Sequence, residues 1–181
     1  MMSLVQAIGQ MAREDVCEVL TQSGEALLTE TDKKAKLKQV TVKSLSANTL
    51  IYRSDKVKFE KLLNSPYGTR HCDYVILTEY NETKRVLYIE MKSTSFKPEK
   101  YSEQLKGAEA MFHLICKVGS SFDLTSESVT DYQPHYVVLH KLPLTKSLTT
   151  LKIPANKSVQ STLELYVNDS NTLDIGDLII D

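Results

Sequence analysis

The stretch from residue 72 to residue 92 constrains the fold more than any other, because it has the pattern of a single β-hairpin. Two runs rich in β-branched and aromatic residues, 72–79 and 84–92, flank the polar residues 80–83. The natural turn has an even length, formed either by Asn81–Glu82 or by all of 80–83. Because turn length sets the register of a hairpin, an even turn fixes which residues of the two runs lie opposite each other.

In that register Asp73 lies opposite Glu90, with their Cβ atoms about 5 Å apart. Side chains two residues apart on a strand share a face, so Lys92 points the same way as Glu90. The same face carries Val86 and Tyr88 earlier in the strand. It therefore changes from apolar to charged along its length, as expected for a sheet whose centre is covered and whose end opens into a cleft.

Two carboxylates at this range repel, which raises the pKa of one of them unless a cation lies between them. Mg²⁺ suits such a pair, because it typically binds one or two carboxylates and keeps several waters. The metal would lower the pKa of a bound water and neutralise a phosphate, while Lys92 orients the nucleophile and stabilises developing charge. An isolated Glu-x-Lys would be a solvated strand end. The opposed Asp73 instead favours a site for phosphodiester hydrolysis with Mg²⁺ or Mn²⁺ as cofactor.

Asp73 is followed 17 residues later by Glu90-Met91-Lys92, on a hairpin that precedes a helix and another strand. This combination resembles the PD-(D/E)XK nuclease superfamily, and the resemblance covers roughly residues 70–140. It implies Asp73 and Glu90 as metal ligands, the backbone carbonyl of Met91 as a candidate further ligand, and Lys92 as the catalytic lysine. Cys72 stands where the family name has proline.

The resemblance adds three further candidates. Some members carry a glutamine on the helix after this strand, and Gln104 occupies that place, so it joins the candidate catalytic set. A plain glutamine at a helix edge is the alternative. Many members also supply an acid from the first helix, and Asp15 and Glu18 are the candidates for that role.

The remainder of the chain predicts alternating helices and strands. Helices are expected from Leu4 to Leu20, from Ser54 to Leu63 and from Pro98 onward. Strands are expected within 36–53, at His135–His140 and, shorter, at 144–148, 162–167 and 178–180. We expect one nuclease-like domain over 1–181. Its class is α/β, with a restriction-endonuclease-like mixed central sheet flanked by helices and a β-rich C-terminal extension.

The small net charge of -1 conceals a basic segment. Between Lys33 and Lys61 there are nine basic and two acidic residues, a local charge of +7. Such a segment could bind a polyanion, so we expect nucleic acid as the partner, with DNA favoured over RNA. A solvated lysine-rich face is the alternative. No apolar run approaches the roughly 18 residues of a membrane span, and no membrane partner is expected.

The three cysteines, Cys17, Cys72 and Cys116, are widely spaced and odd in number. They predict buried thiols in a reducing, cytoplasmic compartment. The leading functional prediction is a Mg²⁺-dependent hydrolase, an endonuclease that cuts DNA. The alternative is a non-catalytic nucleic-acid-binding or assembly module of the same fold in a larger complex. The sequence leaves open whether the substrate is DNA or RNA and whether the enzyme is an endonuclease or an exonuclease. It also leaves open whether the chain forms a homodimer or is a subunit of a larger complex.

Overall fold

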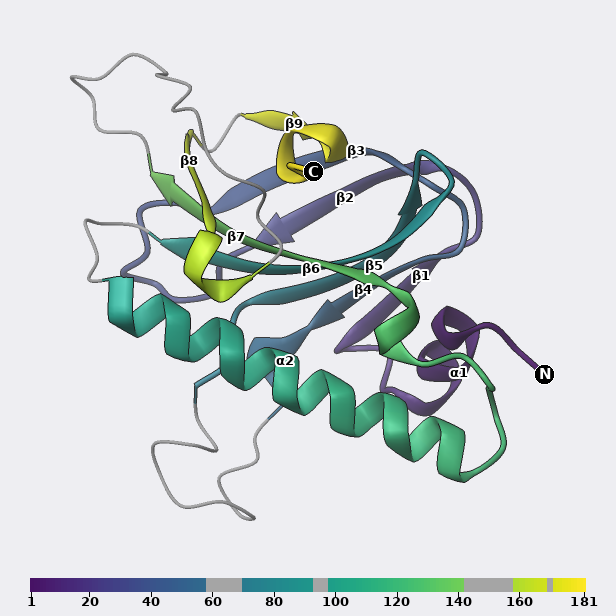
Figure 1. The fold of residues 1–181 in the computed structure, drawn as a ribbon. Coiled ribbons are helices and arrows are strands. Elements are labelled where there is room, and N and C mark those ends of the chain that lie inside the picture. The colour runs from purple at the N-terminus through teal and green to yellow at the C-terminus, as the bar shows by residue number, and fades with distance from the viewer. Residues whose placement is uncertain (58–69, 93–97, 142–157, 169–170) are drawn as a thin grey trace.

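The computed structural model describes residues 1–57, 70–92, 98–141, 158–168 and 171–181 (Figure 1). In these residues nine strands form two sheets, accompanied by two α-helices. The helices are α1 (Leu4–Met11) and α2 (Pro98–Ser121). The strands are β1 (Cys17–Leu20), β2 (Gly24–Thr29), β3 (Gln39–Leu45), β4 (Thr49–Arg53), β5 (Tyr74–Tyr80), β6 (Thr83–Lys92), β7 (Gln133–Lys141), β8 (Leu163–Val167) and β9 (Thr172–Asp174).

The larger sheet has six strands in the order β1-β4-β5-β6-β7-β8. The pairs from β1 to β6 are antiparallel, whereas β6, β7 and β8 run parallel to one another. Helix α2 connects β6 to β7, the kind of crossover that two parallel neighbours need. The α/β class and the mixed central sheet expected from the sequence are therefore confirmed.

The β5–β6 hairpin has the predicted register. A two-residue turn, Asn81–Glu82, joins Tyr80 to its partner Thr83. Both turn residues have positive φ, 50° and 59°, as a type I′ turn requires. Seven pairs follow, from Tyr80 opposite Thr83 to Tyr74 opposite Ile89, so the next position along the pair brings Asp73 to Glu90.

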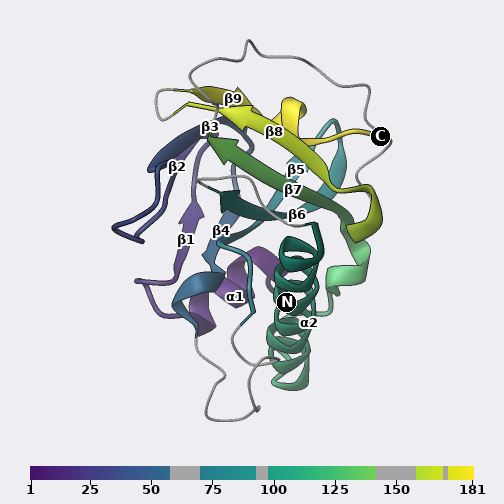
Figure 2. The ribbon, with the colours of Figure 1, turned by 90° about the vertical axis from the view of Figure 1, so that its left-hand side faces the viewer.

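Apolar side chains cover both faces of the larger sheet. The two helices lie on one side of it and the small sheet lies on the other (Figure 2). Helices α1 and α2 pack on the face that carries Val75, Val86 and Tyr88. The small sheet, in the order β2-β3-β9, covers the opposite face, where Ile76 and Leu87 lie. The expected flanking by helices thus holds for one face, while in the described residues strands cover the other.

The first helix is shorter than expected, so the prediction of a helix from Leu4 to Leu20 is wrong beyond Met11. Ser3 begins α1 with a reciprocal capping box to Gln6, and the chain is extended at Ala12. Residues 17–20 instead form β1 and pair with β4. Pairing with a neighbouring strand prevails here over a helical phase that Val19 happened to fit.

Other expected elements also differ at their ends. Of the helix expected at Ser54–Leu63, the described part is a single 3-10 turn, Ser54–Lys56, and residues 58–63 lie outside the described residues. The strand expected at 178–180 is not formed: a 3-10 turn, Ile175–Leu178, ends there, and residues 179–180 have no regular structure. The expected strand at 144–148 also lies outside the described residues. The C-terminal strands β8 and β9 complete the two sheets and do not form a separate extension.

The three cysteines are free thiols. Cys72 and Cys116 are buried, as the sequence predicted, whereas Cys17 is only half-buried. Burial raises the pKa of the Cys72 and Cys116 thiols above the ordinary value. Among the described segments, no helix is long and apolar enough to cross a membrane.

Candidate active site

The parallel strands β6, β7 and β8 end side by side at one end of the larger sheet, and several polar side chains near these strand ends lie on the face covered by α2. Register partners on neighbouring strands share a face, and so do residues two apart along each strand. Two rows of side chains result. The first contains Glu90, Val138 and Glu164, and the second contains Lys92, His140 and Tyr166.

Asp73 joins the first row from the residue just before β5. One oxygen of its carboxylate, Oδ2, accepts a hydrogen bond from the backbone N–H of Met91, with 2.6 Å between the heavy atoms. The structure therefore brings together Asp73, Glu90 and Lys92, the three residues on which the sequence prediction of a catalytic site rests. The side chain of Met91 is buried on the opposite face, against the small sheet.

Glu90 is a carboxylate placed almost wholly inside the protein, with 1% of its surface exposed. Its Oε1 forms an ion pair with the ammonium group of Lys92. Burial raises the pKa of Glu90 to about 7, although the Lys92 charge and a hydrogen bond from Gln104 act in the opposite direction. Among the described residues, no hydrogen-bond donor reaches the other oxygen, Oε2.

The pKa of Asp73 is also raised, well above its ordinary value. Burial is the largest cause and the negative charge of Glu90 is the second, while the N–H of Met91 opposes both. A cation placed between the two carboxylates would offset the cost of burying their charges and would cancel their repulsion. The Glu90 oxygen that has no donor among the described residues, with a second carboxylate beside it, therefore fits a hard divalent ion that binds oxygen and keeps waters.

Helix α2 contributes Gln104 to the site. The side chain of Gln104 donates a hydrogen bond of 3.4 Å to the carbonyl oxygen of His71, and its hydrogen bond to Glu90 lowers the pKa of that carboxyl. Gly107 allows the helix to approach this closely, because a Cβ atom there would lie 1.9 Å from the carbonyl oxygen of Arg70. The structure thus places Gln104 at the predicted site, between the chain entering β5 and the carboxylate on β6.

The two acids expected from a first helix do not join the site. Asp15 lies in the exposed turn after α1, where Arg13 donates two hydrogen bonds of 2.9 Å to its carboxylate. Glu18 is exposed on β1, which β4 separates from β5. Both expectations depended on a helix continuing to Leu20, and the helix ends at Met11.

An acid that the sequence did not predict, Glu30, lies just after β2 and close enough to act on both carboxylates. The phenol of Tyr74 holds the end of that strand, accepting from the N–H of Thr29 at 2.7 Å and donating to the Thr29 carbonyl at 2.9 Å. Glu30 follows directly, and its charge contributes to the raised pKa of both Asp73 and Glu90. No sequence signal marks Glu30, because its proximity depends on how the two sheets pack.

Sequence reasoning also missed a hydrogen-bonded chain at the same edge. Tyr101 on α2 donates to Oε1 of Glu164, and Oε2 of Glu164 lies 3.0 Å from Nε2 of His140. Since an ionised carboxylate only accepts, Nε2 of a neutral His140 must carry the proton. The ring of His140 stacks on that of Tyr166, with 5.1 Å between centroids. The one available signal was the position of His140 at the end of a predicted strand.

The lysine-rich loop between β2 and β3 leads away from Glu30. Lys33, Lys34, Lys36 and Lys38 are exposed there. The ammonium of Lys38 also donates to the carbonyl oxygens of Asp32 and Lys33, at 2.8 and 3.2 Å. Within the predicted basic segment, Lys58 and Lys61 lie outside the described residues. The loop therefore carries an excess of positive charge directly after Glu30, the acid whose charge acts on Asp73 and Glu90.

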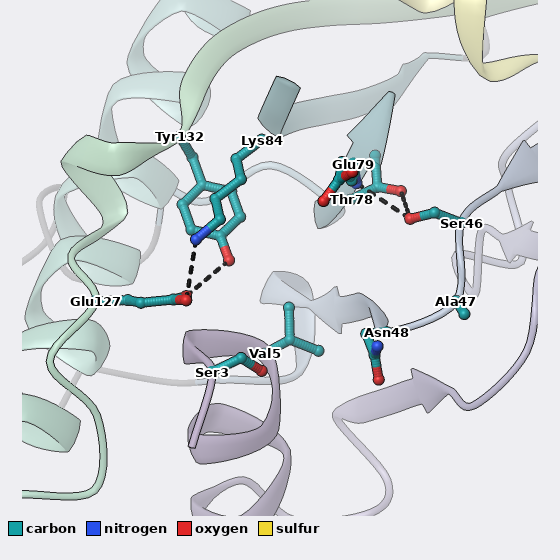
Figure 3. A pocket seen from close by; sticks show the side chains of 10 residues that line it. All are labelled: Ser3, Val5, Ser46, Ala47, Asn48, Thr78, Glu79, Lys84, Glu127 and Tyr132. Carbon is teal, nitrogen blue, oxygen red and sulfur yellow. Dashed lines mark hydrogen bonds and ion pairs between the residues drawn. The ribbon is translucent and has the colours of Figure 1, made fainter. Parts of the chain in front are cut away.

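A separate pocket of about 170 Å³ lies near the opposite end of the hairpin (Figure 3). Two of its charged groups are paired with each other: Lys84 lies 2.9 Å from Glu127, and the Tyr132 hydroxyl donates to Glu127 at 3.3 Å. The N–H of Leu4 also donates to Glu127, at 2.9 Å. These contacts connect α1, β6 and the segment before β7, so we assign them a role in packing.

Comparisons of the chain with protein-family models, with curated proteins and with solved structures found no match. The interpretation of the site therefore depends on its geometry and chemistry.

Proposed function

We propose that this protein is a metal-dependent nuclease that hydrolyses phosphodiester bonds, with DNA as the substrate. The observation that carries the proposal is the buried carboxylate of Glu90, which has one oxygen without a donor among the described residues. Asp73 lies beside it and Lys92 is paired with it. Holding the buried Glu90 beside a second, half-buried acid at a strand end costs free energy, and a bound cation would offset that cost.

Asp73 and Glu90 would hold the divalent ion, with the Met91 carbonyl as a further candidate ligand. When bound, such an ion lowers the pKa of a water and neutralises charge on a phosphate. The N–H of Met91 fixes the orientation of the Asp73 carboxylate, and Gln104 orients Glu90. Lys92 is the cation that orients the attacking water and stabilises charge developing on the phosphate.

The surroundings of the site suit a polyanionic substrate. The loop carrying Lys33, Lys34, Lys36 and Lys38 follows Glu30, which itself acts on both catalytic carboxylates. Positive charge beside an acidic metal site would hold the phosphate backbone while leaving the acids free for the ion. The order of hairpin, helix and parallel strand also agrees with a PD-(D/E)XK core, so the proposal includes a restriction-endonuclease-like fold.

The direct test is cleavage of supercoiled plasmid DNA by the purified full chain in Mg²⁺ or Mn²⁺, compared with EDTA. We expect nicking or cutting with metal and none with EDTA. Asp73→Asn should abolish cleavage because it removes one metal ligand. Asp15→Asn is the matched control, since Asp15 is an exposed acid paired with Arg13, and it should cut at the parental rate.

Intact plasmid with either metal at high protein concentration would contradict the proposal. If that protein still bound DNA, with an affinity that falls with salt and is unaffected by Asp73→Asn, it would instead be a non-catalytic binding module.

A further inference from the structure

Tyr166 is an exposed aromatic side chain in the same row as Lys92. The two residues are connected by His140, which pairs in register with Lys92 on one side and with Tyr166 on the other. Two strand spacings separate them, so their backbones lie about 10 Å apart. Tyr166 is 37% exposed, although it lies at an end of the sheet where Glu90 and His140 are buried.

The ring of Tyr166 is held in place from one side. It stacks on the imidazole of His140, with 5.1 Å between centroids and 25° between planes. His140 is fixed in turn by Glu164, and Glu164 by the hydroxyl of Tyr101 on α2. Because His140 covers one ring face, a ligand would have to approach the other face or the ring edge. A ring that is already fixed on one side loses little conformational entropy when a second ring stacks on it.

We propose that Tyr166 is a stacking platform for an unpaired nucleobase of the substrate. This inference rests on the proposed nuclease function, because it places a base about 10 Å from the lysine that acts on the phosphate. Aromatic side chains beside positive charge are the common way in which proteins hold single strands, since every base has a π-face. A base within a duplex has both faces covered by its neighbours. The platform therefore selects a single strand, a strand end or an extruded base.

The test compares two short single strands of equal length and charge, one of deoxythymidines and one in which every base is absent. Binding is measured by fluorescence anisotropy of an end label in EDTA, so no cleavage occurs. The parental protein should bind the base-bearing strand more tightly. Tyr166→Ala should lower that affinity by roughly 5- to 150-fold and leave the abasic strand unaffected.

Two variants complete the experiment. Tyr166→Phe keeps the ring and should retain the preference for bases. Unchanged binding of the abasic strand by Tyr166→Ala shows that this variant is still folded. Phe122→Ala removes an aromatic side chain that is 73% exposed just beyond α2, and it should change neither affinity. Equal binding of the two strands by the parental protein, or equal effects of Tyr166→Ala on both, would overturn the inference.

The result separates this inference from the nuclease proposal. Plasmid cleavage without any preference for base-bearing strands would support the nuclease proposal and refute the role of Tyr166. A preference for bases that depends on Tyr166, in a protein that cleaves no DNA, would support the role of Tyr166 and refute the nuclease proposal.

Discussion

The carboxylate of Asp73 accepts a hydrogen bond from the backbone N–H of Met91, so one acid of the site is tied to the strand that carries the other acid. Met91 stands between Glu90 and Lys92, and therefore the orientation of Asp73 is set by the backbone of the Glu-x-Lys sequence itself. This tie holds the two acids together although burial raises the pKa of both and the charge of Glu90 raises that of Asp73 further.

Replacing Lys92 should separate catalysis from metal binding. Lys92→Met keeps the length of the side chain and removes its charge, so cleavage should fall by about 10²-fold or more, the scale of one preorganised electrostatic group. Metal binding should persist at pH 8, because both carboxylates remain. Asp73→Asn and Glu90→Gln should lose binding and cleavage together. Calorimetric metal titration beside plasmid cleavage tests the contrast, and a Lys92→Met protein that cuts at the parental rate would refute the mechanism.

Metal affinity should decrease as the pH falls below about 7. The pKa of Glu90 is raised to about 7, so below that pH a proton competes with the ion for the carboxylate. The apparent affinity for Mn²⁺ should fall by roughly tenfold per pH unit, and binding at pH 6 should release protons into the buffer. Calorimetry in two buffers with different ionisation enthalpies measures that release. An affinity that is constant between pH 5 and pH 8 would be incompatible with this site.

Without metal, Glu90 should make the protein less stable at high pH. A raised folded-state pKa contributes stability below the unfolded value of 4.5, and this contribution is lost as the pH rises through about 7. The loss is on the order of 3 kcal/mol between pH 4.5 and pH 8. Urea unfolding in EDTA should show a weaker pH dependence for Glu90→Gln than for the parental protein. Parallel curves for the two proteins would contradict the raised pKa.

His140 should titrate below its ordinary value of 6.5. Burial lowers its pKa, the negative charge of Glu164 raises it in part, and the charge of Lys92 lowers it. Glu164→Gln should therefore move the midpoint further down, whereas Lys92→Met should move it up. Ring resonances of His140 followed by NMR across pH report both shifts. A midpoint above 6.5 in the parental protein would show that Glu164 outweighs burial.

The lysine loop between β2 and β3 should govern the salt dependence of DNA binding. Changing Lys33, Lys34, Lys36 and Lys38 to Gln should weaken binding and flatten the slope of log K against log salt by up to about 0.9 per lost phosphate contact. Lys117→Gln, which removes an exposed lysine from the second half of α2, is the control and should have little effect. An unchanged slope in the fourfold variant would assign the substrate to another surface.

The sequence predicts those residues of the site whose positions depend on neighbouring residues in the chain. Hairpin register depends on the two residues Asn81 and Glu82, so the opposition of Asp73 and Glu90 follows from a pattern within one short stretch. Helix α2 is also predicted from a local sequence pattern, and it places Gln104 at the site.

The remainder depends on contacts between distant segments. Glu164 reaches Tyr101 and His140 only because β8 pairs beside β7, and no local pattern in the sequence indicates that pairing. Glu30 approaches because the small sheet packs over the larger one, with Tyr74 binding the end of β2. The predicted first helix extends too far because Val19, which lies in a strand, is at a position that also fits helical spacing.

The Asn81–Glu82 turn limits how the length of this chain could change over evolution. Exposed turns usually tolerate the gain or loss of single residues. Here β6 extends ten residues from the turn to Lys92, and one added residue that slipped the pairing by one step would move Asp73 to the face of the small sheet. A pair of added residues could extend the hairpin without changing faces. Functional descendants of this chain should therefore differ in hairpin length by even numbers, although the turn itself touches nothing in the site.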